Sequence, residues 1–231
     1  MNELESLKDE DMKYSVLLKL QMIRRVYLTD SAIRNGFLKS IPNIRKLGCN
    51  IMGTSMGIDH SHLHKLKILR VFSSCLSRVI FPCNIRKLFL HDCAIKPGEL
   101  TTLHKLEVLK INRCMFGSEW ESCDGDIFCS LQFLCLEELR LVRWIADETN
   151  FPRLRHLFIE DCPHLKEIPG DIGEIPTLQL IELVGCSDSA LASARRIEEV
   201  QQSEYDNYDL RLRISRDHTA KRCGFSNADE S

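Results

Sequence analysis

Cysteine and histidine have the widest chemical range in this chain, and their spacing decides what they could do. The 231-residue sequence contains 11 Cys and 8 His. Cys123, Cys129 and Cys135 do not have the C-x-x-C spacing that is typical of zinc sites. The run from His60 to His64 has a His at every second position and resembles a metal-binding tract. His64 also belongs to an L-H-K-L phrase that recurs later in the chain, so a structural role is predicted here and metal binding is the alternative.

The motifs of the common catalytic classes do not occur. The sequence has no G-x-S-x-G, no H-E-x-x-H and no Gly-Lys pair, and without that pair a phosphate-binding P-loop cannot form. The acidic pairs Glu137/Glu138 and Glu198/Glu199 are typical of solvated surfaces. We therefore expect a protein that is not an enzyme and that holds no metal and no cofactor in this chain.

Composition predicts a protein with a sizeable core and no general affinity for nucleic acid or bilayers. The chain is 44% hydrophobic, and its 31 basic and 33 acidic residues give a net charge of -2. The acidic N-terminal MNELESLKDED does not read as a signal peptide, and no apolar run of about 20 residues is present. An odd number of cysteines and no N-x-S/T acceptor favour a reducing compartment. We expect a cytoplasmic protein, with peripheral association with a membrane as the alternative.

Apolar residues recur at a fixed spacing between Phe151 and Cys186. The pattern L-x-x-L-x-L-x-x-C occurs twice there, first at Leu154, Leu157, Ile159 and Cys162, then at Leu178, Ile181, Leu183 and Cys186. This is the signature of a leucine-rich repeat, a short strand with a return segment. One such repeat cannot bury its apolar side alone, so stacked copies are required.

The first three positions of this pattern recur upstream, at irregular intervals. They fall at Ile23, Val26 and Leu28; Ile44, Leu47 and Cys49; Leu66, Leu69 and Val71; Ile85, Leu88 and Leu90; Leu106, Leu109 and Ile111; and Leu136, Leu139 and Leu141. We predict an α/β fold, a curved leucine-rich-repeat solenoid of about eight irregular repeats, with parallel strands on its concave face.

Four regions are predicted along the chain: a degenerate repeat or cap at 1–19, repeats at 20–186, a capping helix and edge strand at 187–214, and a disordered tail at 215–231. The interval from Met115 to Leu131 is polar and contains glycine, so a surface loop is predicted there.

Four cysteines follow the repeats in a constant position. Each lies three residues after the last apolar residue of its repeat, where leucine-rich repeats use Asn or Cys to turn the chain. A structural role is predicted for Cys93, Cys114, Cys162 and Cys186.

The side chains between the last two core positions of each repeat are the candidate binding site. They alternate with the core residues and would form a column on the concave face. Arginine and aromatic residues on rigid elements often anchor protein interfaces, and an ordinary solvated face is the alternative. The column contains Tyr27, Gly48, Arg70, Phe89, Lys110, Arg140, Phe158 and Glu182, with Arg113 and Arg143 in a flanking column.

The last third of the repeat region resembles a known family. FPRLRHLFIEDCPHLKEIPGDIGEIPTLQLIELVGCSDSALASARRIEE is similar to the end of plant intracellular nucleotide-binding leucine-rich-repeat receptors, in particular the nightshade late-blight resistance type with an N-terminal coiled coil. The upstream FPCNIRKLFLHDCAIK is similar to their earlier repeats. The resemblance covers about residues 20–214.

This resemblance implies a recognition and regulatory module in innate immune defence and the hypersensitive response. The expected partners are proteins: a pathogen effector, a guarded host protein or the receptor's own nucleotide-binding domain. ATP or ADP is expected only in an upstream domain, which this chain does not include. The alternatives are a substrate-recruiting adaptor of the F-box type and an enzyme-associated inhibitor.

Overall fold

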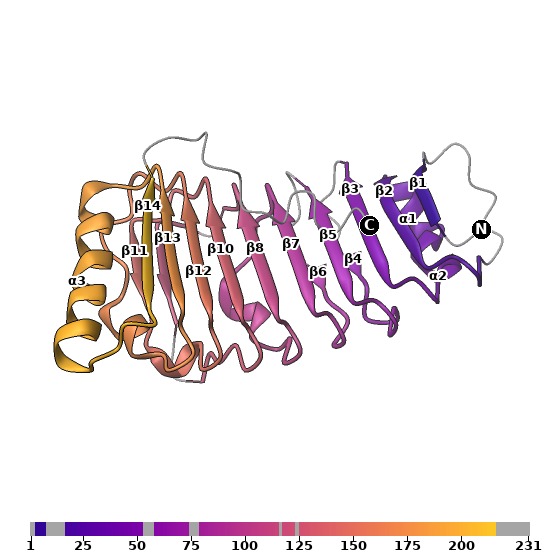
Figure 1. The fold of residues 1–231 in the computed structure, drawn as a ribbon. Coiled ribbons are helices and arrows are strands. Elements are labelled where there is room, and N and C mark those ends of the chain that lie inside the picture. Colours follow the sequence, from indigo (N-terminus) through magenta and orange to yellow (C-terminus); the bar gives the residue numbers. More distant parts are fainter. Residues whose placement is uncertain are drawn as a thin grey trace. The chain divides into compact units, whose positions relative to one another are not determined.

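The computed structural model describes residues 3–7, 17–52, 58–73, 79–115, 117–122 and 125–215. The chain divides into two compact units, unit 1 at Met1–Phe116 and unit 2 at Gly117–Ser231. Each unit is an α/β structure built on parallel strands with few helices, which is consistent with the predicted stacking of repeats (Figure 1). Residues 1–2, 8–16 and 216–231 of the predicted end regions lie outside the described residues.

Unit 1 contains a parallel sheet whose strands lie side by side in sequence order. Each repeat contributes one strand, and its return segment contributes short helices or a second, small strand. The sheet order is β1 (Glu3–Leu7), β2 (Met22–Leu28), β3 (Lys46–Ile51), β5 (Ile68–Phe72), β7 (Lys87–His91) and β8 (Val108–Asn112). The return segments contain α1 (Asp30–Arg34), α2 (Phe37–Ser40), the 3-10 helix η2 (Pro97–Leu100) and the paired strands β4 (Ile58–Asp59) and β6 (Val79–Ile80).

Unit 2 repeats this plan and ends in a helix and a strand. Its parallel strands are β10 (Phe133–Glu137), β12 (His156–Glu160), β13 (Leu180–Val184) and β14 (Arg211–Ser215). The return segments contain the pair β9 (Glu119–Glu121) and β11 (Arg143–Ile145), with the 3-10 helices η3 (Glu148–Asn150) and η4 (Gly170–Glu174). The helix predicted after Cys186 is α3 (Asp188–Glu204), capped by the Ser187 hydroxyl, which accepts a hydrogen bond from the Ala190 amide.

The predicted core positions are confirmed in most repeats. Their side chains alternate with residues on the other face of each strand, so they pack against the return segments while the alternating residues do not. Fully or almost fully buried are Leu47, Leu69, Leu88, Leu109, Leu157 and Ile181.

Strands β7, β8 and β12 are each followed by a residue with left-handed backbone conformation. Asp92 (φ 56°), Arg113 (φ 53°) and Asp161 (φ 51°) each come directly after a strand and directly before a buried cysteine. This conformation is unfavourable for side chains other than glycine, and its recurrence shows that each turn is held by its surroundings.

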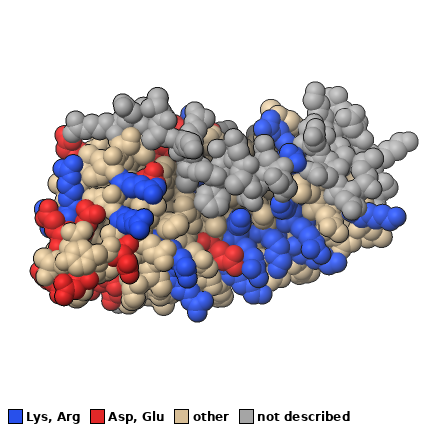
Figure 2. Space-filling model, viewed as in Figure 1, with Lys and Arg blue, Asp and Glu red and all other residues tan. Residues whose placement is uncertain are grey.

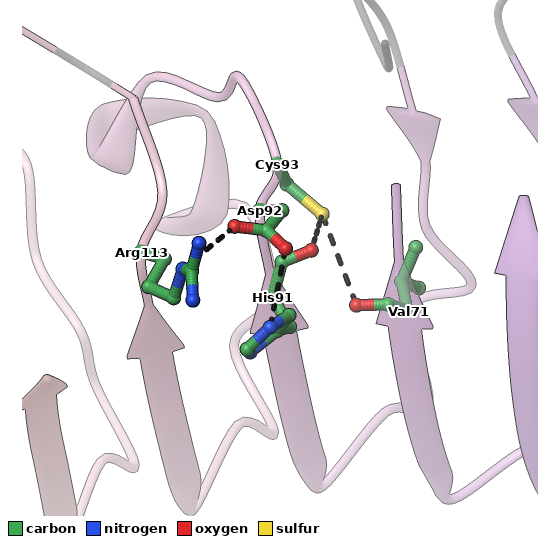
Figure 3. A network of polar contacts seen from close by, with 5 residues as sticks. All are labelled: Val71, His91, Asp92, Cys93 and Arg113. Atoms are coloured by element: carbon green, nitrogen blue, oxygen red, sulfur yellow. Dashed lines mark hydrogen bonds and ion pairs between the residues drawn. The ribbon is translucent and has the colours of Figure 1, made fainter. Parts of the chain in front are cut away.

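The cysteines that follow these residues have the structural role predicted for them. The Cys93 thiol lies 3.3 Å from the carbonyl oxygen of His91 in its own strand and 3.8 Å from that of Val71 in the preceding strand (Figure 3). Sulfur therefore donates to backbone carbonyl groups at the strand end. The same two kinds of contact recur at Cys162 and Cys186.

Two short sequence motifs alternate along the chain, N-I-R-K-L and L-H-K-L. They contact each other where the strands begin. The Asn84 side-chain amide donates to the His64 carbonyl (2.9 Å) and accepts from Lys105 Nζ (2.7 Å). Asn43 accepts from Lys65 Nζ in the same way (2.8 Å). An asparagine in one repeat therefore links its neighbours on both sides.

One repeat was predicted in the wrong register. The prediction centred it on Leu136, Leu139 and Leu141, whereas the strand is β10 and its core residues are Leu134 and Leu136. The stretch from Leu131 to Leu139 fits the leucine spacing equally well in either register. The observed register lets β10 pair with β12 along its whole length.

The first repeat contains an irregularity that the spacing did not reveal. Ile23 pairs with Leu47 but Val26 pairs with Cys49, so β2 has one extra residue between these pairs. The prediction placed Tyr27 opposite Gly48, but Tyr27 lies opposite Asn50.

The surface loop predicted from Met115 to Leu131 is also corrected. It contains β9, and Trp120 and Phe128 within it are 3% and 4% exposed. Trp120 stacks on Trp144 with ring centroids 5.4 Å apart, and both tryptophans pack edge-on against Phe151. The segment therefore supplies a second, aromatic core to unit 2.

We predict that Gly48→Ala destabilises unit 1 by about 2 kcal/mol or more. The bulge in β2 brings the Arg24 carbonyl oxygen within 2.0 Å of where a Cβ at position 48 would lie, so backbone must move. Gly170→Ala is the matched control, because no atom lies within 4 Å of its added Cβ. Urea denaturation of both variants tests this. Equal midpoints would mean that the bulge yields without cost.

Candidate functional site

The ladder face of unit 1 is the side of its sheet that carries the residues alternating with the core leucines. Arg70, Phe89 and Lys110 are direct neighbours in register on β5, β7 and β8, as predicted. Because side chains alternate along a strand, the residues two positions before and after them lie on the same face. This adds Lys46, Asn50, Phe72, Lys87, His91 and Asn112 to the ladder face.

Strands β2, β3, β5, β7 and β8 of the unit 1 sheet carry basic residues and no acidic one. Their cations are Arg24, Arg25, Lys46, Arg70, Lys87 and Lys110. Figure 2 shows Lys and Arg side chains gathered over these strands on the face turned to the viewer. This local field attracts acidic partners although the net charge of the chain is only -2.

Aromatic rings are interleaved with these cations. The Arg70 guanidinium carbon lies 4.5 Å from the centre of the Phe89 ring, a cation–π contact between adjacent strands. The Phe72 and His91 rings are 4.7 Å apart and form a second cross-strand pair. Phe72 is 43% exposed, so an apolar ring is presented beside the charged groups.

A polar network lies where β7 and β8 end (Figure 3). One Asp92 carboxylate oxygen is 3.1 Å from Arg113 Nε, and the other is 3.2 Å from His91 Nε2. Arg113, a predicted site residue, therefore lies after its strand and is held by the neighbouring repeat. All three side chains are partly exposed, so this pair orients Arg113 more than it stabilises the fold.

The ladder face of unit 2 has a different character. Phe158 lies between Cys135 and Glu182 in register, which places two predicted site residues side by side. Cys135, Phe158 and Val184 form a buried apolar cluster with Phe133 packed against it. Glu137, Glu160 and Glu182 share this face with the cluster, and Arg213 Nη1 on β14 approaches Glu182 at 4.0 Å.

Arg140 and Arg143 do not belong to the ladder face. Arg140 follows β10, and Arg143 begins β11 in the return segment, so the register error displaced both predictions. Cys135 occupies the position assigned to Arg140. The alternative register beginning at Leu131 would have identified it. Phe72 and His91 were also missed, because they lie two residues after the predicted column, a position that neither that column nor the flanking ones included.

The three histidines of the predicted tract do not converge. His60 is fully buried, His62 is half-buried and His64 is exposed. Among the residues that the structure describes, neither ring nitrogen of His60 has a hydrogen-bond partner. Over the residues that the structure describes, no group of three or more His, Cys, Asp and Glu side chains could hold a metal ion.

Three of the cysteines, Cys49, Cys162 and Cys186, are unreactive as nucleophiles. Burial raises the pKa of the Cys49 thiol and that of the Cys162 thiol to about 12, and it also raises the pKa of Cys186. A thiol reacts as its thiolate, so these groups stay protonated near neutral pH. They suit a hydrogen-bonding role at the strand ends and not a nucleophilic one.

These features define a repeat-type parallel-sheet protein whose strands present ordered side chains on the face opposite the core. The ladder faces offer cations, carboxylates and rings on rigid strands, which suits recognition of another macromolecule. The helices in the described part of the chain are too short or too polar to cross a bilayer.

In sequence the chain is a relative of the late blight resistance protein homologs of Solanum demissum. It is 33% identical over 188 residues to homolog R1B-16, 34% over 194 residues to R1B-13 and 30% over 210 residues to R1B-23. The matches cover 76%, 78% and 84% of this chain but only 15%, 17% and 16% of those relatives. No family model matches the chain. The resemblance predicted from the repeats to plant disease-resistance proteins is confirmed.

We predict that His60 makes the fold sensitive to acid. Burial, and then the charge of His62, lower the pKa of His60 from 6.5 to about 4. Between these values the unfolded chain binds a proton that the folded chain does not. Stability attributable to His60 is therefore full above pH 6.5 and falls by about 3 kcal/mol toward pH 4.

Urea denaturation from pH 7.5 to pH 4 measures this effect. His60→Leu should flatten the acid-side loss of stability relative to the wild type, whereas His64→Leu, at an exposed position, should not. Parallel pH curves for the wild type and His60→Leu would show that His60 does not control the acid response.

Proposed function

We propose that this chain is the leucine-rich-repeat recognition region of a plant disease-resistance receptor. It binds proteins through its ladder faces and has no catalytic role. Its homology to the late blight resistance protein homologs supports the receptor class, and the parallel strands with left-handed turns and buried cysteines support the repeat type. Because the chain spans about one sixth of those relatives, nucleotide binding and signalling belong to other parts of such a receptor.

The row formed by Arg70, Phe89 and Lys110 carries this proposal. Three adjacent strands hold a cation, a ring and a second cation in register, with Arg70 stacked over Phe89. The backbone of a strand is already ordered before binding, so contacts made from it cost less ordering entropy than similar contacts made from a loop. The partner is a protein with an acidic and partly apolar surface, from the pathogen or the host cytoplasm.

We predict that Arg70→Ala combined with Lys110→Ala weakens partner binding at least about ten-fold, because anchor residues of an interface contribute about 2 kcal/mol or more each. The fold should be nearly unchanged, since both side chains are half-buried on the face opposite the core and surface substitutions usually stay within about 0.5 kcal/mol. Partners are first identified by proximity labelling in leaf tissue challenged with late blight pathogen, and the affinity of each purified partner is then measured.

The control is Lys39→Ala with Lys96→Ala. It removes the same charge from exposed positions in the return segments of the same unit. Loss of binding in the control with retention in the ladder variant would move the site to the return segments. Equal loss in both would indicate a nonspecific electrostatic attraction.

A further inference from the structure

Cations are concentrated at the edge of unit 1 where its strands begin. Because the strands are parallel, the residue before each strand comes to the same edge of the sheet. The Lys67 amide donates to the Arg45 carbonyl oxygen (2.9 Å) and the Arg86 amide to that of Lys67 (2.8 Å), so these cations are adjacent in consecutive repeats. All three side chains are exposed, and neighbouring repeats are about 5 Å apart. Figure 2 shows Lys and Arg side chains gathered on this side, where the arrows of Figure 1 start.

A second row lies two residues earlier in each repeat. Lys65 and Lys105 are exposed there, and each Nζ donates to an asparagine of the preceding repeat, to Asn43 at 2.8 Å and to Asn84 at 2.7 Å. A neutral acceptor orders each lysine and does not cancel its charge. The basic edge is defined as the six cations of the two rows: Lys19, Arg45, Lys65, Lys67, Arg86 and Lys105.

An exposed leucine lies within the basic edge. Leu18 is 61% exposed and directly precedes Lys19. Its carbonyl oxygen accepts a hydrogen bond from Asn43 Nδ2 (2.7 Å), and the other side-chain atom of this asparagine accepts from Lys65. Leu17 beside it is 37% exposed. The edge therefore presents an apolar tip together with a row of cations.

One acidic residue ends the first row. Glu107 follows Arg86 in the row, because its amide donates to the Arg86 carbonyl oxygen (2.8 Å), and its carboxylate pairs with Arg86 Nη1 at 3.0 Å. The positive field is therefore strongest from Lys19 to Lys67, on the side of the edge that carries Leu18. Charge and apolar surface coincide there.

This combination fits an anionic membrane surface. Acidic headgroups attract clustered Lys and Arg, and a leucine between such cations can enter the boundary of the acyl chains. Single-stranded nucleic acid is bound through stacked aromatic rings, and the basic edge contains none. Four of its six cations are lysine, a residue that is depleted at protein interfaces.

We propose that the basic edge of unit 1 binds the surface of a membrane that contains anionic phospholipid. Leu18 enters the headgroup region, and the cations lie over the phosphate and carboxylate groups. The row formed by Arg70, Phe89 and Lys110 lies further along the strands, so it stays accessible to a protein partner. This inference goes beyond the proposed function, because it concerns other residues and a different class of partner.

Sedimentation with lipid vesicles tests the proposal. The full 231-residue chain is mixed with vesicles of phosphatidylcholine and phosphatidylserine in equal parts, or with phosphatidylcholine alone. It should bind only the mixed vesicles, and added salt should release it because exposed charges are screened. Arg45→Ala combined with Lys67→Ala should weaken binding about ten-fold or more, since each cation near an anionic surface contributes about five-fold. Leu18→Ser should weaken binding several-fold and leave its salt dependence unchanged.

The matched control is Arg34→Ala with Lys96→Ala. It removes the same charge from exposed positions of unit 1 that follow strand ends, and it should bind vesicles like the wild type. Urea denaturation shows whether each variant is folded. If the Arg45 and Lys67 variant is not, Lys65→Gln with Lys105→Gln replaces it, and unchanged binding of that variant would overturn the proposal.

Three further outcomes would also overturn it. Equal binding to both kinds of vesicle would mean that anionic lipid is not recognised. Equal loss in the Arg34 and Lys96 control would reduce the effect to net charge. Single-stranded RNA that displaces the vesicles, and whose own binding is lost in the Arg45 and Lys67 variant but kept in Leu18→Ser, would assign the edge to nucleic acid.

The proposed function and this inference can fail separately. Arg70→Ala with Lys110→Ala, which tests the ladder face of unit 1, should bind vesicles like the wild type. Loss of vesicle binding in that variant, with retention in the Arg45 and Lys67 variant, would mean that the ladder face and not the basic edge contacts the membrane.

Discussion

A strand of this protein can bury its apolar side only against its own return segment and the strands beside it. The sequence repeats one spacing for this reason, and variation is confined to what lies between the strands. The turn after a strand is the most tightly constrained part of the backbone in this arrangement. A residue such as Asp161 adopts an unfavourable left-handed conformation there, and the cysteine that follows it is thereby brought into the core beside backbone carbonyl groups. Regular stacking depends on this repeated backbone turn, which the leucines alone do not specify.

Core positions could be predicted from the sequence wherever only one register satisfied the spacing. Leu88 and Leu157 were identified in this way, because the residues around them fit the L-x-x-L-x-L spacing in one register. The stretch from Leu131 to Leu139 was different, since its leucines satisfy two registers. Only the pairing of β10 with β12 distinguishes them, and a contact between distant residues is not encoded in local spacing.

Other features depended on three-dimensional contacts that composition conceals. Trp120 lies in a stretch rich in Gly, Ser and acidic residues, a composition that predicts a surface loop. It is nevertheless buried, because Trp144 and Phe151 from later in the chain pack against it. The bulge in β2 has no signal of its own. Gly48 is the one residue that indicates it, because a glycine within a strand often marks a close approach of another backbone segment. The candidate site inherited these errors, since each ladder position is counted from the register of its strand.

The alternation within each strand separates the two tasks of this protein. Residues such as Leu88 and Leu109 stabilise the stacked repeats, while Phe89 and Lys110 beside them contribute little to that stability. Ladder residues can therefore change their chemistry while the backbone stays the same. The two ladder faces illustrate this, because one backbone plan carries cations and rings in unit 1 and carboxylates around an apolar cluster in unit 2. A surface that can be altered without unfolding its scaffold is what recognition of changing protein partners requires.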